Sequence, residues 1–418
     1  MSPIARSKAR RRRIRSHRAV TAAVATVLLL TPACGLSSET AGKTDTAKGP
    51  ITIGMSLPLT GPVADRSKPG LEGYQYWADE INAKGGLLGR QVKLKVYDDK
   101  FEQTTAISDY NRLISQDKVD LLLGTFSSDL NLAVAPVAER YKYVYVEPSG
   151  GADEIFARKF NFLFFAQPAT TQKLPDQFIS VIEKMSASER PKSVAFIQAD
   201  DPNTSQAAKI FEDRLKPLGV RAVYNKTYAP DTSNFDTIAN AIKQAAPDLV
   251  ISGALAGDGV SLIRSFQKVG FSPQMLYQEN SPTDPAFPEA VGAKNTEAIF
   301  TPIAWSSKSA FPSNKAFVEG YTKQKGSAPS EDTADSYAAA QILAAAVEGV
   351  GKLDQPAMAD WLHKNTVDTV VGPMSWDATG KPQGELLLGQ FQSGSIQVVA
   401  PSNAATVKDL VYAKPQWQ

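Results

Sequence analysis

The residues that most often perform catalysis are scarce in this chain. Beyond residue 33 it has one histidine, His363, beside Trp361 in a predicted helix, and we interpret it as a structural residue. The only cysteine of the 418 residues is Cys34. A Ser–His–Asp or Cys–His nucleophile is therefore poorly supported, and so is a zinc site. We predict no enzyme activity, no metal and no cofactor.

Paired carboxylates are the remaining residues that could perform catalysis. Asp98 with Asp99, and Asp200 with Asp201, each follow a predicted strand. Two carboxyl groups can act together in a glycosidase. Adjacent acids at strand ends are more often solvated loop residues, and we interpret these four in that way. The chain has neither a P-loop motif nor a GxGxxG motif after a strand.

Small polar residues follow two neighbouring strands of the first half. The segment 124–129 reads GTFSSD and opens a predicted helix. Hydroxyls and free backbone N–H groups at the positive end of a helix dipole suit a carboxylate. Simple N-capping by Ser127 or Ser128 explains the same residues equally well. The segment 147–151 reads EPSGG, where two glycines let the backbone approach a ligand or form a tight turn.

The second half places other polar segments after its strands. They read ADDPN at 199–203, GALAGDG at 253–259 and YQENS at 277–281. Glu279 lies in the last of them. An acid after an apolar strand is a candidate partner for an ammonium group, although many such residues simply face water.

Alternating strands and helices must bring these segments together. Period-2 and period-3.6 patterns predict strands at 51–59, 91–97, 119–123 and 143–146, with helices at 70–82, 104–115 and 127–141. The alternation restarts with strands at 193–197, 221–224, 248–253 and 274–277, and helices at 205–218, 235–245 and 260–269. Such repeats predict an α/β fold of two doubly wound lobes, each with a parallel sheet. A ligand then binds beyond the carboxyl ends of the strands.

The first 34 residues have the features of an export signal. A cation-rich run at 6–18 precedes twelve uncharged, mostly apolar residues at 19–30, and Ala33 stands directly before Cys34. This order resembles the lipobox of bacterial lipoproteins, in which the cysteine is lipidated and becomes the new N-terminus. We therefore predict a signal peptide at 1–33 and a lipid anchor on Cys34, which holds the protein on the outer face of the cell membrane.

The residues after the signal form a mildly acidic protein. Residues 1–33 contain eight of the 45 Lys and Arg and none of the 43 Asp and Glu, which leaves the remainder at about −6. Such a balance gives no electrostatic reason to expect nucleic acid as a partner. Residues 34–49 are small and polar, and we predict that they form a flexible tether.

Several segments together resemble a known family. They read IGMSLPLTGPVA, YWADEINAKGGLLGRQVKLKVYDD and VDLLLGTFSSD early in the chain, and VDTVVGPMSWDATG late in it. In this order they resemble the type I periplasmic binding proteins, and most closely the leucine/isoleucine/valine-binding group that feeds ABC importers. The resemblance implies two lobes joined by a three-crossover hinge, with 50–168 and 303–390 in lobe 1 and 169–302 and 391–418 in lobe 2.

The resemblance also implies a set of ligand-binding residues. The carboxylate would meet Ser128 and the neighbouring backbone, and the ammonium would meet Ser149, the 150–151 turn and Glu279. The full set implied in this way is Arg66, Phe126, Ser127, Ser128, Ser149, Gly150, Gly151, Asn203, Leu255, Glu279 and Tyr337.

Four of these positions depart from the family's usual residues. Gly151 stands where a threonine is usual, and Asn203 and Leu255 stand where tyrosines often lie. Arg66 replaces an aromatic residue of the side-chain pocket. An aliphatic ligand therefore does not follow from the resemblance, and Arg66 leaves room for an acidic or polar one.

The sequence thus predicts a monomeric, lipid-anchored solute receptor. It would capture an amino acid or related carboxylate by lobe closure and deliver it to an ABC importer permease. A first alternative keeps the fold and changes the ligand to an aromatic or short-chain carboxylate without an amine. A second is a ligand-sensing domain whose closure signals to a partner.

Overall fold

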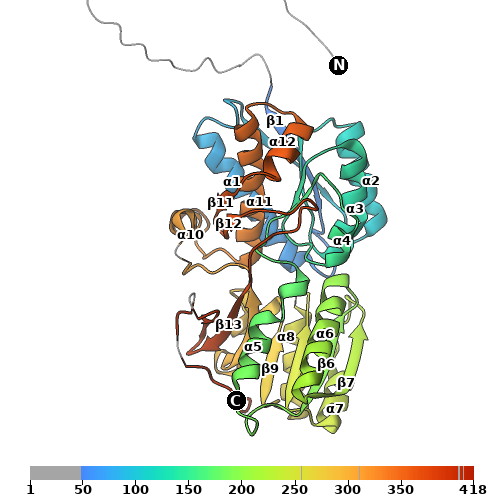
Figure 1. Ribbon diagram of the computed structural model, residues 1–418, viewed down its shortest axis with the longest axis vertical. Helices are drawn as coiled ribbons and strands as arrows, with labels where there is room; N and C mark the ends of the chain where they lie inside the picture. Colours follow the sequence, from blue (N-terminus) through green and yellow to red (C-terminus); the bar gives the residue numbers. More distant parts are fainter. Residues whose placement is uncertain (1–48, 256, 310, 403–404, 408) are drawn as a thin grey trace, which may run out of the picture. The chain divides into compact units, whose positions relative to one another are not determined.

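The computed structural model describes residues 49–255, 257–309, 311–402, 405–407 and 409–418 (Figure 1). The predicted signal peptide, Cys34 and the predicted tether up to residue 48 lie outside this part of the chain. The described residues form one compact unit. Among the helices that the structure describes, none is long and apolar enough to cross a membrane.

The first half of the chain forms a five-stranded parallel sheet in the order β2-β1-β3-β4-β5. Its strands are β1 (Ile51–Leu57), β2 (Val92–Asp98), β3 (Leu121–Leu123), β4 (Tyr145–Glu147) and β5 (Leu163–Phe165). The helices between them are α1 (Ala64–Ala83), α2 (Gln103–Ser115), α3 (Ser128–Tyr141) and α4 (Asp153–Ala157).

Helices cover both faces of this first sheet because its strands are apolar on both sides. Leu121 and Leu123 pack in the core that contains α1, whereas Leu122 between them packs in the core that contains α2 and α3. This is the side-chain alternation of a strand buried on both faces. On α1, Tyr74 and Trp77 are buried at helical spacing.

The second sheet has seven strands in the order β14-β13-β10-β9-β8-β6-β7. They are β6 (Ser193–Ala199), β7 (Arg221–Tyr228), β8 (Leu249–Gly253), β9 (Met275–Gln278), β10 (Ile299–Ile303), β13 (Leu387–Gln392) and β14 (Ser395–Ala400). Strands β6 to β10 are parallel, and β13 and β14 add an antiparallel pair at one edge.

Helices cover the second sheet in the same way. One face carries α7 (Asp236–Ala245) and α8 (Asp258–Val269), and the other carries α5 (Asp176–Lys184) and α6 (Pro202–Leu215). The strand residue Val250 packs with the first pair and Ile251 with the second. The short helices η1 (Thr171–Lys173), η2 (Lys216–Leu218), η3 (Ser281–Thr283), α9 (Phe287–Val291) and η4 (Ala293–Thr296) complete this region.

The chain returns to the first sheet after β10. The returning elements are α10 (Pro312–Lys325), α11 (Glu331–Val350), α12 (Gln355–Leu362) and the hairpin of β11 (Val367–Thr369) and β12 (Gly372–Met374). Their apolar side chains join the core of β1 and α1, and α11 lies beside α1 (Figure 1). The division into two lobes stays a prediction. We propose to place its third crossing before Leu387 instead of after 390, because β13 pairs with β10 of the second sheet.

The predicted α/β class with two doubly wound sheets is confirmed. Each strand and helix predicted between residues 51 and 278 is present, with ends shifted by a few residues. The antiparallel pair β13–β14 was not predicted, because the alternation of strand and helix gives no information about it.

Candidate functional site

A small pocket lies beyond the carboxyl ends of strands from both sheets, where this fold is expected to bind a ligand. Its volume is about 70 Å³. Eight of the predicted residues line it: Arg66, Phe126, Ser127, Ser128, Ser149, Gly151, Asn203 and Leu255. Gly150, Glu279 and Tyr337 do not. Lining residues that the sequence analysis missed include Thr171, Asp201, Asn280, Glu331 and Asp332.

The amino end of α3 faces this pocket without a side-chain cap. We considered N-capping by Ser127 or Ser128, and the structure contradicts it, since neither hydroxyl accepts a hydrogen bond from the first turn of the helix. Ser128 Oγ instead accepts a hydrogen bond from the Ala152 N–H at 3.1 Å. Ser127 Oγ is buried and has no hydrogen-bond partner among the described residues. The first turn of α3 therefore keeps backbone donors for an anion.

Two pocket residues have strained backbones. Ser127 adopts φ 73° and ψ 154°, a region that glycine occupies almost alone, and Asn280 adopts φ 57° and ψ −67°. Each follows a strand, Ser127 in the first sheet and Asn280 in the second. Strain of this kind costs about 1–3 kcal/mol per residue and gathers at ligand-binding sites.

The turn after β4 holds the next hydroxyl in place. Ser149 Oγ accepts a hydrogen bond from the Ser127 N–H at 3.3 Å, and the Ser149 N–H donates to Glu147 Oε2 at 2.9 Å. Glu147 is fully buried, which raises the pKa of its carboxyl to about 8. A Cβ at Gly150 would lie 2.6 Å from Glu147 Oε1. A side chain at position 150 would therefore collide with the Glu147 carboxylate, which gives Gly150 a structural reason independent of a ligand.

Asp201 lines the pocket from the second sheet. We expected a solvated loop residue, and this was wrong, since Asp201 is only 2% exposed; Asp99, of the other acidic pair, is also buried. Asp201 Oδ1 caps α6 by accepting from the Asn203 N–H at 2.8 Å, and Oδ2 has no partner of good hydrogen-bond geometry in the described part of the chain. Burial raises the pKa of Asp201 to about 6, although the nearby N–H groups of Asn203 and Asp129 favour the ionised form.

Glu279, unlike Asp201, does not line the pocket. It is 2% exposed, and its Oε2 has no hydrogen-bond partner among the residues that the structure describes. Burial and, after it, the charge of Asp201 raise the pKa of Glu279 well above its usual range. The two carboxyl groups therefore form a buried acidic pair in which only Asp201 reaches the pocket.

Neighbouring side chains occupy the space beside Gly151 that a larger residue would fill. A Cβ at this position would lie 3.1 Å from Asn203 Oδ1 and 3.3 Å from Thr171 Oγ1. The Thr171 hydroxyl in turn donates a hydrogen bond to Asn203 Oδ1. Asn203 and Thr171 therefore occupy the space that a threonine at 151 would need, and they present polar atoms there.

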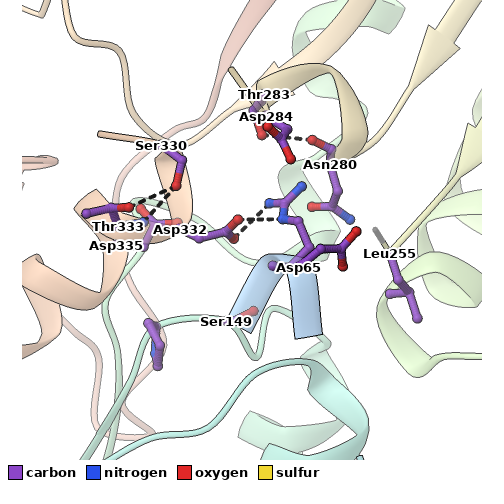
Figure 2. Close-up of polar contacts among 12 residues, drawn as sticks. Asp65, Ser149, Leu255, Asn280, Thr283, Asp284, Ser330, Asp332, Thr333 and Asp335 are labelled. Atoms are coloured by element: carbon purple, nitrogen blue, oxygen red, sulfur yellow. Dashed lines mark hydrogen bonds and ion pairs between the residues drawn. The ribbon is translucent and has the colours of Figure 1, made fainter. Parts of the chain in front are cut away.

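Arg66 lines the pocket together with Glu331 and Asp332, and the part of the lining formed by these three residues is called the Arg66 end. Its guanidinium pairs with Asp332 through Nε–Oδ2 at 2.5 Å and Nη2–Oδ1 at 2.8 Å, and its side chain is 4% exposed. Figure 2 shows this ion pair as dashed lines reaching Asp332, with Asp65 and Asn280 beside it. The sequence could not show the pair, because its partners are separated by 266 positions.

Tyr337 does not line the pocket, although the resemblance implied a place for it among the ligand-binding residues. Its hydroxyl donates to Glu80 on α1, and its ring lies 4.6 Å from that of Phe317. On α11 the pocket is lined by Glu331 and Asp332. Six residues beyond Glu331 correspond to a rotation of about 240° around a helix, which directs Tyr337 to another face.

The comparisons with known proteins agree with this architecture. A family model described as periplasmic binding protein matches residues 50–395, so the chain belongs to this family. An amino acid binding protein of Pseudomonas aeruginosa is 26% identical over 346 residues, which is 82% of this chain and 90% of the relative. Leu/Ile/Val-binding protein homolog 7 of Brucella suis is 27% identical over 375 residues, 86% of this chain and 93% of the relative.

A solved structure shows the same fold. The solute-binding protein of an ABC transporter from R. palustris, in complex with benzoate, has a TM-score of 0.75 and 20% identity, and the match covers 86% of this chain and all of that one. Within its family the chain is a type I periplasmic binding protein of the branched-chain amino acid ABC group, as its motifs predicted. Proteins of this family are exported, non-enzymatic components of transporters that bind small molecules.

Proposed function

We propose that this chain captures an amino acid or amino-acid-like carboxylate in the pocket and delivers it to an ABC importer permease. One observation carries the proposal. The uncapped amino end of α3, with Ser127 and Ser128, and the buried acid Asp201 line the same small pocket. The first group suits a carboxylate and the second suits an ammonium group.

The separation of these two groups fits an α-amino acid. Its carboxylate and ammonium share one carbon atom, so their partners must be neighbours. Asp201 lies close enough to the Asp129 N–H, in the first turn of α3, for that donor to affect its pKa. Burying both charges without partners would cost several kcal/mol, so the paired ends should supply most of the affinity.

Glu279 supports the proposed ammonium site although it does not line the pocket. In the absence of a cation, the charge of Asp201 disfavours the ionised form of Glu279, and burial disfavours the ionised form of both carboxyls. An ammonium group beside Asp201 would relieve this repulsion and stabilise both negative charges. The pair thus acts as one acidic site, with Asp201 as the contact residue and Glu279 as its electrostatic support.

The remaining parts of the proposal follow from the sequence and the family. Closure of the two proposed lobes on the solute would shift a population between open and closed states. The protein would act as a monomer, anchored through lipidated Cys34 on the outer face of the membrane. The relatives named for amino acids favour this cargo, and the benzoate complex makes an amine-free carboxylate the alternative to be tested.

A thermal-shift screen tests this function. The purified protein is unfolded, refolded to remove retained ligand, and heated with single amino acids and small carboxylates. A ligand at 100 times its dissociation constant stabilises a protein by about 2.7 kcal/mol, enough to be detected. We expect shifts with amino acids that Asp201→Asn removes and Asp200→Asn, at the exposed neighbouring residue, retains.

Shifts only with amine-free carboxylates would keep the transport role and reject the ammonium site. No shift with any member of either class would contradict the proposed function.

A further inference from the structure

The end of the pocket at Arg66 contains an unused hydrogen-bond donor. Nη2 of the guanidinium donates a hydrogen bond to Asp332, and Nε lies in ion-pair contact with the same carboxylate without good hydrogen-bond geometry, whereas Nη1 is buried and has no hydrogen-bond partner among the described residues. Leaving a buried charged donor without a partner is costly. Because Arg66 lines the pocket, a ligand can supply the missing acceptor.

Carboxylates surround this single cation. Asp332 and Glu331 line the same pocket, and the negative charge of Asp284 also acts on Arg66. Asp65, the preceding residue, interacts with it as well. One carboxylate already neutralises the guanidinium, so an anionic group on the ligand would meet net repulsion there.

The same acids offer hydrogen-bond acceptors to a ligand donor. Glu331 Oε2 accepts from the Ala304 N–H at 3.0 Å, and Oε1 of this pocket residue accepts no hydrogen bond from the described part of the protein. A cationic group could use these acceptors, but it would stand against the guanidinium of Arg66. A neutral group that both accepts and donates hydrogen bonds is repelled neither by the carboxylates nor by the guanidinium.

The rest of the lining suits a short aliphatic stem. Leu174, Leu255 and Leu386 line the pocket, and Phe126 is its one aromatic residue among those the structure describes. This surface can cover a few methylene groups. It does not compensate for Arg66 Nη1, which a purely aliphatic side chain would leave unpaired.

We propose that the Arg66 end of the pocket binds an uncharged group that accepts and donates hydrogen bonds, a carboxamide above all, so that the solute is a polar and not an aliphatic amino acid. The carboxamide oxygen accepts from Arg66 Nη1, and its NH₂ donates to Glu331 or Asp332. This assignment rests on the proposed function, because it takes the α-carboxylate and the ammonium as held by α3 and Asp201.

Two series of matched ligands test the assignment by titration calorimetry on the refolded protein. The five-carbon series is L-glutamine, L-glutamate and L-norvaline, and the four-carbon series is L-asparagine, L-aspartate and L-2-aminobutyrate. Within a series only the terminal group changes. In the better-bound series we expect the carboxamide to bind at least tenfold more tightly than either other member, since sites built for a polar group strongly reject ligands that lack it.

A paired variant separates this contact from general stability. Arg66→Met with Asp332→Asn removes both charges of the ion pair and should reduce the preference for carboxamide over aliphatic ligand below threefold. The matched control, Arg214→Met with Asp176→Asn, removes an ion pair between side chains that are 36% and 43% exposed, and should keep the preference. If the first variant does not fold, the ratio in the unmodified protein decides.

An aliphatic or anionic member that binds as tightly as the carboxamide would overturn the assignment while amino-acid binding itself stood. Failure of all six ligands, together with a thermal-shift screen in which no amino acid or carboxylate binds, would overturn the proposed function and this inference with it.

Discussion

Asp201 is the residue on which ligand affinity should depend most visibly on pH. Burial raises its pKa to about 6, so below that value the free protein carries a protonated carboxyl. An ammonium group requires the ionised form. We therefore expect the affinity for an amino acid to rise about tenfold from pH 5 to pH 7, because deprotonation must accompany binding at the lower pH.

Calorimetry at the two pH values measures this change, and the proton release appears as a dependence of the binding heat on the buffer. An affinity that stays constant or falls between pH 5 and pH 7 would remove Asp201 from the ammonium site.

Individual residues also show which parts of the pocket could be predicted from the sequence and which could not. Ser128, Ser149 and Asn203 line the pocket together because the strand ends that carry them meet there, while their role in binding stays a prediction. Asp201 was misread, although its position before Pro202 marks a helix start, where an acid is a common N-cap. The ion-pair partner of Arg66 lies on a helix that is far away in the sequence, so no local sequence pattern indicates this contact.

At the scale of elements, the amino end of α3 combines strain with free donors. Ser127 holds φ 73° and ψ 154°, which glycine would adopt without strain. We expect Ser127→Gly to raise the free energy of unfolding by about 1 kcal/mol, as strain relief exceeds the added backbone entropy. The same change should weaken ligand binding severalfold, since the unpartnered Ser127 hydroxyl is lost.

Urea unfolding and calorimetry measure the two effects. Ser393→Gly is the control, because Ser393 also has a positive φ, 53°, but lies in the exposed turn between β13 and β14. It should leave binding unchanged. A Ser127→Gly protein that is less stable, or that binds as tightly as the unmodified chain, would show that the strain is not tied to the ligand.

The order of elements was predictable because strands and helices differ in the periodicity of their apolar residues and are separated by turn residues. Tyr337 illustrates the limit of such reasoning. The face of α11 that meets the pocket is set by packing against α1, which a pattern local to the helix does not indicate. Likewise, β13 and β14 join the second sheet through pairing with β10, about 90 residues earlier in the chain, a contact that is not encoded locally.

At the scale of the whole molecule, buried acids should make the ligand-free protein more stable in mild acid. Burial raises the pKa of Asp99 and Asp201 to about 6, of Glu331 to about 7 and of Glu147 to about 8. Each group binds its proton more tightly in the folded state. Its stabilising contribution is complete below its unfolded pKa and is lost as the pH rises through the folded value.

We therefore expect the urea midpoint of the ligand-free protein to fall between pH 5 and pH 8, with a loss of at least about 3 kcal/mol in the free energy of unfolding. Glu147→Gln should reduce the fall of the urea midpoint between pH 7 and pH 8, because Glu147 has the highest pKa of these four carboxyls. A midpoint that rises over this range would mean that these carboxyls are not buried as described.

The most direct test of the proposed function compares an amino acid with the same acid lacking its amine. The purified, refolded protein is titrated by calorimetry with the amino acid that gives the largest thermal shift and with its deaminated counterpart. We predict that the amine contributes at least tenfold in affinity, that Asp201→Asn reduces this factor below threefold, and that Asp200→Asn preserves it. A deaminated acid that binds the unmodified protein as tightly as the amino acid would contradict the site described here.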